Sequence, residues 1–240
     1  MSWQNVATIA LKDIRVMLMR RSMRIALVAL PLGLGVGFSQ IVAFGHFPAS
    51  VLPRTLNAFL FFFVMYTGAL PATLAAYSVV GEKVERSLEP LLATPATDAE
   101  ILLGKGLAAL VPPLCAMWAG MLVLMAYCDV LTRSTLGSLY FPNWTAAVTV
   151  LGVAPLIATM GVSFSIFFSS RVSEVRTAQQ LGALVALPSA GVYVATLSGA
   201  FTLDLASLGI MCGILAVVDV TLALAVHRSF RREEILTRWA

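Results

Sequence analysis

Charged residues are scarce in this chain: Asp, Glu, Lys and Arg together make up only 12% of its 240 residues. A soluble domain of this size carries about a quarter. Hydrophobic residues make up 59%, and the mean hydropathy is +0.90. A soluble fold could not bury that much apolar surface. The composition therefore excludes a soluble protein and indicates an integral membrane protein.

The residues that build most catalytic sites are also few. The chain has two histidines and three cysteines, and it shows no CxxC, HExxH or GxSxG pattern. A P-loop is missing too, because Gly106 follows Gly104-Lys105 and Ala99 stands where the leading glycine belongs. We therefore expect no enzyme active site, no bound metal or cofactor and no ATP hydrolysis by this chain. Cys115, Cys128 and Cys212 are interpreted as small packing residues.

Long apolar runs are what the sequence does contain. Each run has about 20 residues or more, the length that an α-helix needs to cross a bilayer. The runs lack the alternation of a membrane β-barrel. The sequence predicts an all-α polytopic membrane protein with six transmembrane helices, in a single permease domain spanning residues 1–240. The expected spans are Ile25–Phe44, Leu56–Val80, Ile101–Tyr127, Trp144–Phe168, Ala178–Leu197 and Leu205–Val226.

An amphipathic helix is predicted before the first span, within residues 1–24. Helical spacing places Trp3, Ala7, Ala10, Ile14, Met17 and Leu18 on one face. Basic residues lie elsewhere on the helix and at its end, so it is expected to lie on an anionic lipid surface. The alternative is a cytosolic helix packed on protein.

The distribution of basic residues predicts the orientation. Arg54 and Arg133 are the only basic residues in the expected outer loops; the other fourteen of the sixteen fall on the N-terminal segment, at the two inner loops and on the tail 227–240. By the positive-inside rule both termini are cytosolic. The net charge of +4 then reflects membrane orientation and not nucleic-acid binding. We expect a multi-pass protein of a prokaryotic-type plasma (inner) membrane.

Residues 81–100 form the largest expected cytosolic piece between spans. Ser87 can cap a short helix, Pro90 fits its first turn, and Leu88, Leu91 and Leu92 share one face. Thr97 and Glu100 form a capping box at the start of the third span, and Lys105 is expected to reach the membrane interface. The segment is interpreted as a docking helix parallel to the membrane. The alternative is a solvated linker.

The stretch GEKVERSLEPLLATPATDAEILLGK, residues 81–105, resembles the signature of type-2 ABC-transporter permeases. Val84 and Arg86 depart from the residues common in that family. The stretch 169–188 and the tail 230–239 are also similar to the family. The matching residues are Glu82, Lys83, Ser87, Leu88, Glu89, Leu91, Leu92, Thr94, Pro95, Glu100, Ile101, Gly104 and Lys105.

The resemblance implies that this chain is the membrane subunit of an ABC exporter. Two copies would pair with two ATP-binding subunits, which would hold ATP and Mg²⁺. The segment between spans two and three would be the coupling helix that contacts the ATP-binding subunit. Its implied contact residues are Glu82, Lys83, Glu85, Arg86, Leu88, Glu89, Leu91 and Leu92.

A few residues inside the spans also carry predictions. Asp219 either lines a transport path, or it pairs within the bundle or reaches the inner interface. Gln179 and Gln180 are expected to hydrogen-bond between helices. Gly33-xxx-Gly37 would allow a close helix contact, and Pro112-Pro113 and Pro188 should kink or break their helices. The alternative function is an ion-coupled secondary transporter, for which Asp219 is the supporting residue.

Overall fold

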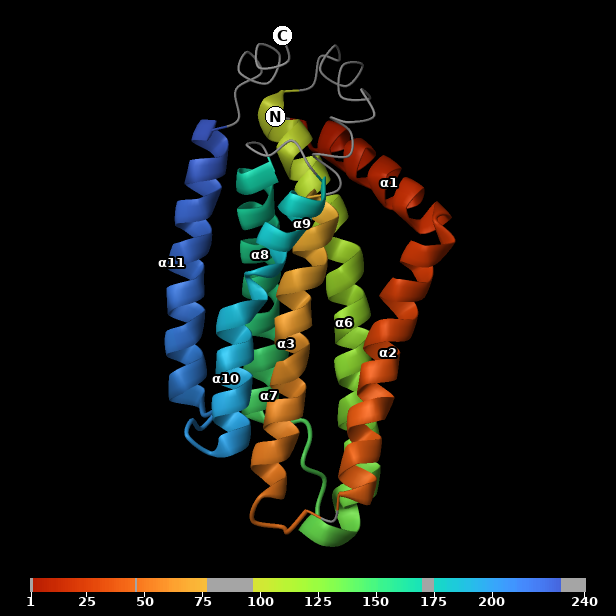
Figure 1. Cartoon of the computed structure of the whole chain (residues 1–240), viewed down its shortest axis with the longest axis vertical. Coiled ribbons are helices and arrows are strands. Elements are labelled where there is room, and N and C mark those ends of the chain that lie inside the picture. The colour runs from red at the N-terminus through yellow and green to blue at the C-terminus, as the bar shows by residue number, and fades with distance from the viewer. Residues whose placement is uncertain (1, 46, 77–96, 170–174, 230–240) are drawn as a thin grey trace.

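The computed structural model describes residues 2–45, 47–76, 97–169 and 175–229, which form an all-α bundle (Figure 1). Six helical runs among these residues are long and apolar enough to cross a membrane, which confirms the predicted number of spans. The chain is a polytopic helical membrane protein. The elements are α1 Trp3–Met19, α2 Arg21–Phe44, α3 Leu52–Ala76, α6 Asp98–Leu136, α7 Trp144–Val148, the π-helical turn η2 Thr149–Val153, α8 Ala154–Ser169, α9 Val175–Ala183, α10 Ala186–Ser198 and α11 Leu205–Ser229.

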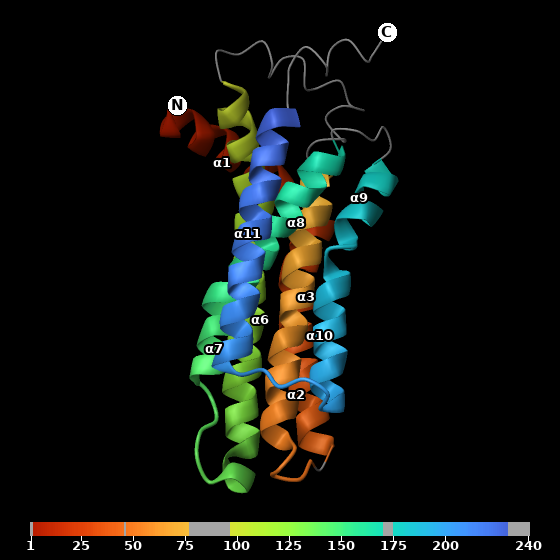
Figure 2. The same ribbon diagram turned by 90° about the vertical axis from the view of Figure 1, so that its left-hand side faces the viewer.

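Helix α3 lies at the centre of the bundle and packs against α6, α8, α9 and α10. Its phenylalanines at 61 and 63 are fully buried. Helix α11 lies at the edge of the bundle in Figure 1 and packs against α8 and the α7–η2 segment. Figure 2 is viewed from that edge and shows α11 in the foreground. Helix α1 lies at the end of the bundle where α3 and α8 end and α6 begins (Figure 1).

Glycines allow the closest helix contacts. A Cβ on Gly120 of α6 would lie 2.6 Å from the carbonyl oxygen of Pro31 in α2, and one on Gly35 would lie 2.7 Å from the carbonyl oxygen of Gly120. Backbones approach this closely in membranes because small residues occupy the contact. Gly33 and Gly37 make no such contact within the described chain, since both have open space where a Cβ would stand, and the predicted close contact stays a prediction.

Helix α6 is longer than predicted. It continues to Leu136 instead of ending at Tyr127, and it ends at Gly137, which adopts the left-handed conformation that favours glycine. The Pro112-Pro113 pair does not break it. Tight packing of neighbouring helices makes proline tolerable in a membrane span.

The other predicted break is confirmed. The fifth span divides into α9 and α10, with a turn at residues 184 and 185. Pro188 cannot donate a hydrogen bond to the carbonyl of Leu184, four residues earlier, and its ring clashes there.

The fourth span also departs from regular α-helix, at η2. Within this π-helical turn, the carbonyl oxygen of Val150 accepts a hydrogen bond from another helix. The donor is the indole N–H of Trp118 in α6, at 2.9 Å.

The N-terminal helix ends at Met19 instead of Arg24, because Arg20 adopts an extended backbone that redirects the chain into α2. Its protein-facing side also differs from the predicted apolar face. The buried residues are Val6, Ile9 and Ala10, whereas Trp3 is 71% exposed. This helix therefore packs on protein through one side and presents other apolar side chains outward.

Candidate functional site

The predicted coupling residues, from Glu82 to Leu92, lie outside the described residues, so their contacts stay predictions. The described chain resumes at Thr97, and there the predicted capping box is confirmed. The Thr97 amide donates to Glu100 Oε2 at 3.1 Å, and the Glu100 amide donates to Thr97 Oγ1 at 3.3 Å. Helix α6 therefore has a fixed start immediately after the predicted coupling segment.

Glu100 binds α1 as well as capping α6. The Ser2 amide donates to Glu100 Oε1 at 2.5 Å, and Asn5 Nδ2 donates to Oε2 at 3.2 Å. Glu100 is only 3% exposed. A buried carboxylate needs such donors, because its desolvation is otherwise costly. One side chain thus holds the first turns of two helices together.

Gly104 and Lys105 continue this contact along α6. A Cβ on Gly104 would lie 2.8 Å from Ile9 Cβ, so only glycine lets α1 come this close. Lys105 Nζ lies 3.6 Å from Asp13 Oδ2, and the two side chains are 5% and 16% exposed. Helix α1 covers Lys105 and supplies a carboxylate beside it, while its predicted reach to the membrane interface stays a prediction.

We call these contacts the α1–α6 junction, made by Ser2, Asn5, Ile9 and Asp13 against Glu100, Gly104 and Lys105. All three α6 residues belong to the stretch on which the family resemblance rests. The sequence missed the α1 side. The feature that could have revealed it is Asp13, an acidic residue that continues the helical spacing of Val6, Ile9 and Ala10.

Asp219 lies in α11 and makes a polar contact with α8. Thr159 Oγ1 donates to Asp219 Oδ2 at 2.6 Å. The other carboxylate oxygen, Oδ1, is buried and has no hydrogen-bond partner among the described residues. Carboxylates within membrane spans are rare and commonly functional, so the unpartnered oxygen keeps Asp219 a candidate for transport.

A pocket of about 410 Å³ adjoins this contact, between α6, α8 and α11. Thr159 lines it together with Ser163, while the other lining residues are apolar or glycine, including Leu102, Leu110 and Val226. The volume lies within the range of small-molecule sites. The hydrogen bond between Thr159 and Asp219 thus links a wall of this pocket to α11.

Gln179 and Gln180 lie in α9, which packs against α3 and α8, whereas Asp219 lies in α11. Gln179 is half-buried and Gln180 is exposed. Neither side chain makes a hydrogen bond to another described residue, so their interhelical role stays a prediction. The described residues also hold no group of three His, Cys, Asp or Glu side chains arranged to bind a metal ion.

No protein-family model matches this chain, and no curated protein matches it significantly in sequence. The features that bear on function are therefore those of the membrane bundle itself: the α1–α6 junction, the Thr159–Asp219 contact and the pocket beside that contact.

Proposed function

We propose that this chain is the permease subunit of an ABC exporter, which forms the substrate path and couples it to a separate ATP-binding subunit. The α1–α6 junction is the observation that supports the architecture required by this proposal. Its residues Glu100, Gly104 and Lys105 form the second half of the permease-like stretch 81–105 and fasten α1 to α6 directly after the proposed coupling segment.

The mechanism follows from that attachment. ATP and Mg²⁺ bind to two partner subunits, whose closure displaces residues 82–95 in each of two copies of this chain. Thr97 starts a rigid helix just beyond that segment, and α1 is held to its first two turns. A displacement is therefore passed to α6 and α1 together, and the two six-span halves change the side to which the path is open.

The orientation proposed here puts α1 in the cytosolic layer. Two features of the bundle support it. Arg54, in the first turn of α3, and Arg133, in the last turn of α6, lie at the end opposite α1. Most of the other basic residues that the structure describes belong to α1 or to the terminal turns of α2, α9 and α11 at the α1 end, as the positive-inside rule requires.

The test is co-purification of the ATP-binding subunit with Leu88→Ala/Leu91→Ala, followed by the ATPase rate of the complex. Each buried leucine contributes about 1.5–3 kcal/mol, so losing two contacts should weaken partner binding by about 100-fold or more. Glu85→Ala removes at most a peripheral ion pair, worth under about 1 kcal/mol, and should weaken binding less than about sixfold.

A matched control removes two leucines elsewhere. Leu122 and Leu187 are 60% and 63% exposed on the outer surface of the bundle, and Leu122→Ala/Leu187→Ala should keep the partner. If Leu88→Ala/Leu91→Ala also keeps its partner and its substrate-stimulated turnover, residues 82–95 are a linker and the proposal fails.

A second candidate is an ion-coupled secondary transporter. The unpartnered Oδ1 of Asp219 and the broken fifth span favour it, because such transporters place ion sites beside interrupted helices. Proteoliposomes that contain this chain alone distinguish the two. Substrate uptake driven by a proton or sodium gradient without any ATP-binding subunit would establish the second candidate and exclude the first.

A further inference from the structure

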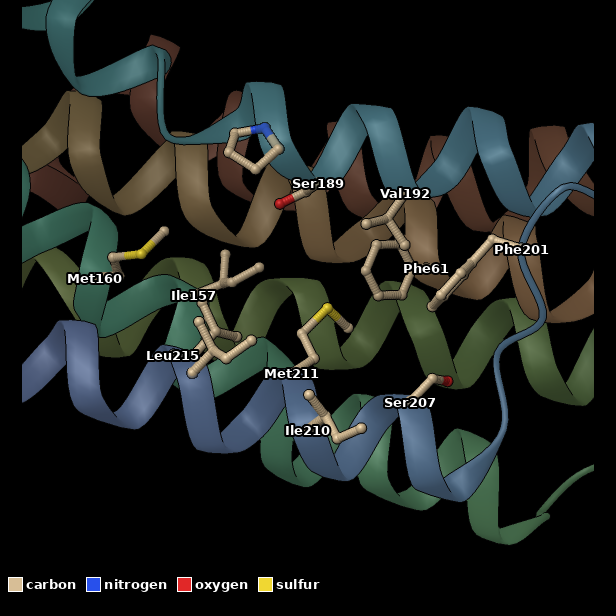
Figure 3. A pocket seen from close by; sticks show the side chains of 12 residues that line it. Phe61, Ile157, Met160, Ser189, Val192, Phe201, Ser207, Ile210, Met211 and Leu215 are labelled. Carbon is tan, nitrogen blue, oxygen red and sulfur yellow. The ribbon is translucent and has the colours of Figure 1, made fainter.

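A second pocket, of about 390 Å³, lies between α3, α8, α10 and α11 (Figure 3). Phe61 of α3 and Ile157 and Met160 of α8 form its inner wall, while α10 and α11 form its sides. Within α11, Ile210 and Ile214 line the pocket and are also 66% and 60% exposed on the outer surface of the bundle. The pocket therefore opens sideways between α10 and α11, toward the lipid.

The lining is almost entirely apolar. No charged residue contributes to it, and its polar side chains are Ser189 and Ser207. Ser207 already has partners, because its hydroxyl lies 3.1 Å from Thr202 O and 3.0 Å from Asp204 O. A charged ligand group would lose its hydration here and gain no counter-ion, which is unfavourable.

Ser189 is the exception in this apolar wall. The residue is 3% exposed, and its Oγ is buried without a hydrogen-bond partner among the described residues. Figure 3 shows its side chain directed from α10 toward the α8 side of the pocket. Most serines in helices satisfy the hydroxyl on a backbone carbonyl of the preceding turn, as Thr196 of α10 does with Val192 O at 2.8 Å. A buried hydroxyl without a partner needs an explanation, and a ligand group supplies one.

We infer that this pocket binds a neutral amphiphile from the bilayer, with a hydrocarbon body and one hydroxyl or carbonyl group that hydrogen-bonds to Ser189. The hydrocarbon body fills the space between Phe61, Met211 and Leu215. Such a molecule enters between α10 and α11 without leaving the lipid phase. The inference that this pocket binds such a molecule is independent of the proposed function. The further step, that the exporter transports this class of molecule, rests on the proposed function.

The binding test uses the full-length chain alone in phosphatidylcholine nanodiscs. The probe is hexadecanol carrying a photoactivatable diazirine, and the cross-linked residues are identified by mass spectrometry. Labelling is expected on residues of the pocket lining. Unlabelled hexadecanol should compete, hexadecane should compete less well, and hexadecyltrimethylammonium should compete least because its charge cannot be satisfied.

Two variants test the site itself. Ser189→Ala should weaken hexadecanol competition by about 2- to 13-fold, the range for one neutral hydrogen bond, and should leave hexadecane unchanged. Met211→Trp should fill the pocket and abolish the labelling. Val217→Trp is the matched control on α11, because Val217 is 65% exposed and lies outside the pocket.

Labelling confined to residues outside the pocket would overturn the inference. So would an unchanged hexadecanol affinity in Ser189→Ala, or competition by the ammonium compound equal to that by hexadecanol. The ATP-binding subunit takes no part in these measurements, so loss of binding counts against the pocket alone. Stimulation of ATPase activity by hexadecanol in the complex, abolished by Met211→Trp, then tests whether the bound class is also transported.

Discussion

Replacing Lys105 by methionine is the sharpest perturbation of the α1–α6 junction. The substitution keeps most of the apolar length of the side chain and removes only the charge. Asp13 then lies 16% exposed beside an apolar neighbour, without the cation now found 3.6 Å away. The prediction is that α1 separates from α6 far more often, while the six spans remain folded.

The magnitude follows from the distance and the burial. At 3.6 Å and an effective dielectric constant of about 20, two unit charges attract by about 4–5 kcal/mol. Removing one partner of a buried pair typically costs about 3–5 kcal/mol, since the other charge stays desolvated. The partial exposure of Asp13 lowers the cost, so we expect about 3 kcal/mol. The equilibrium constant for separation of α1 then rises about 150-fold.

Hydrogen exchange of the amides in residues 3–19 measures this separation in detergent or nanodiscs. Lys105→Met should accelerate exchange across the segment. Asp13→Leu/Lys105→Met should restore slow exchange to within about 1 kcal/mol, because neither member of this ion pair is then left as a lone charge facing the other. Lys12→Met is the matched control. It also removes a lysine charge, but Lys12 is exposed on α1 and should leave exchange unchanged.

Two results would refute the reasoning. Unchanged exchange in Lys105→Met would mean that the ion pair does not hold α1. Equally fast exchange in Lys105→Met and in the double variant would mean that the aliphatic packing of lysine, and not charge pairing, maintains the contact.

Three further predictions concern the spans. Gly161→Leu should destabilise the bundle by at least about 1–3 kcal/mol, measured as thermal stability, because the added side chain meets the α3 backbone; Gly33→Leu has open space and should change little. Asp219→Asn should keep its folded yield but lower transport in the reconstituted complex by about tenfold or more, the cost of losing a charge-assisted hydrogen bond. A cysteine introduced at Ser134 should react with an impermeant label outside intact cells, and one at Ser229 should not; the reverse result would invert the proposed orientation.

Most of the fold was predictable because lipid leaves few options. Runs of about 20 apolar residues must be helices that satisfy their own backbone, and this predicts six spans correctly. Local signals worked equally well at Thr97 and Glu100, where capping depends on residues three apart. Pro188 likewise acts on its own preceding turn.

Features that depend on distant residues were not readable. The partner of Lys105 was not readable because Asp13 belongs to another helix, far from Lys105 in sequence. The expected third span ends at Tyr127, yet the helix continues to Leu136 and ends at the left-handed Gly137. Thr159 gave no sign of its role because one threonine in an apolar span is unremarkable until α11 places Asp219 beside it.

The α1–α6 junction also changes how the family resemblance is weighed. The contact with α1 accounts for all three residues. Glu100 caps α6 and accepts the Ser2 amide, Gly104 leaves space for Ile9, and Lys105 pairs with Asp13. Any membrane protein that packs an N-terminal helix against this turn would need similar chemistry, whatever it transports. These three residues therefore support the architecture more than the ATP coupling. In the proposed exporter, specificity for the ATP-binding partner is assigned to residues 82–95, with Leu88, Leu91 and Leu92 as the proposed contact face. The double-leucine variant is for that reason the decisive experiment on function, and the Lys105 variant its structural counterpart.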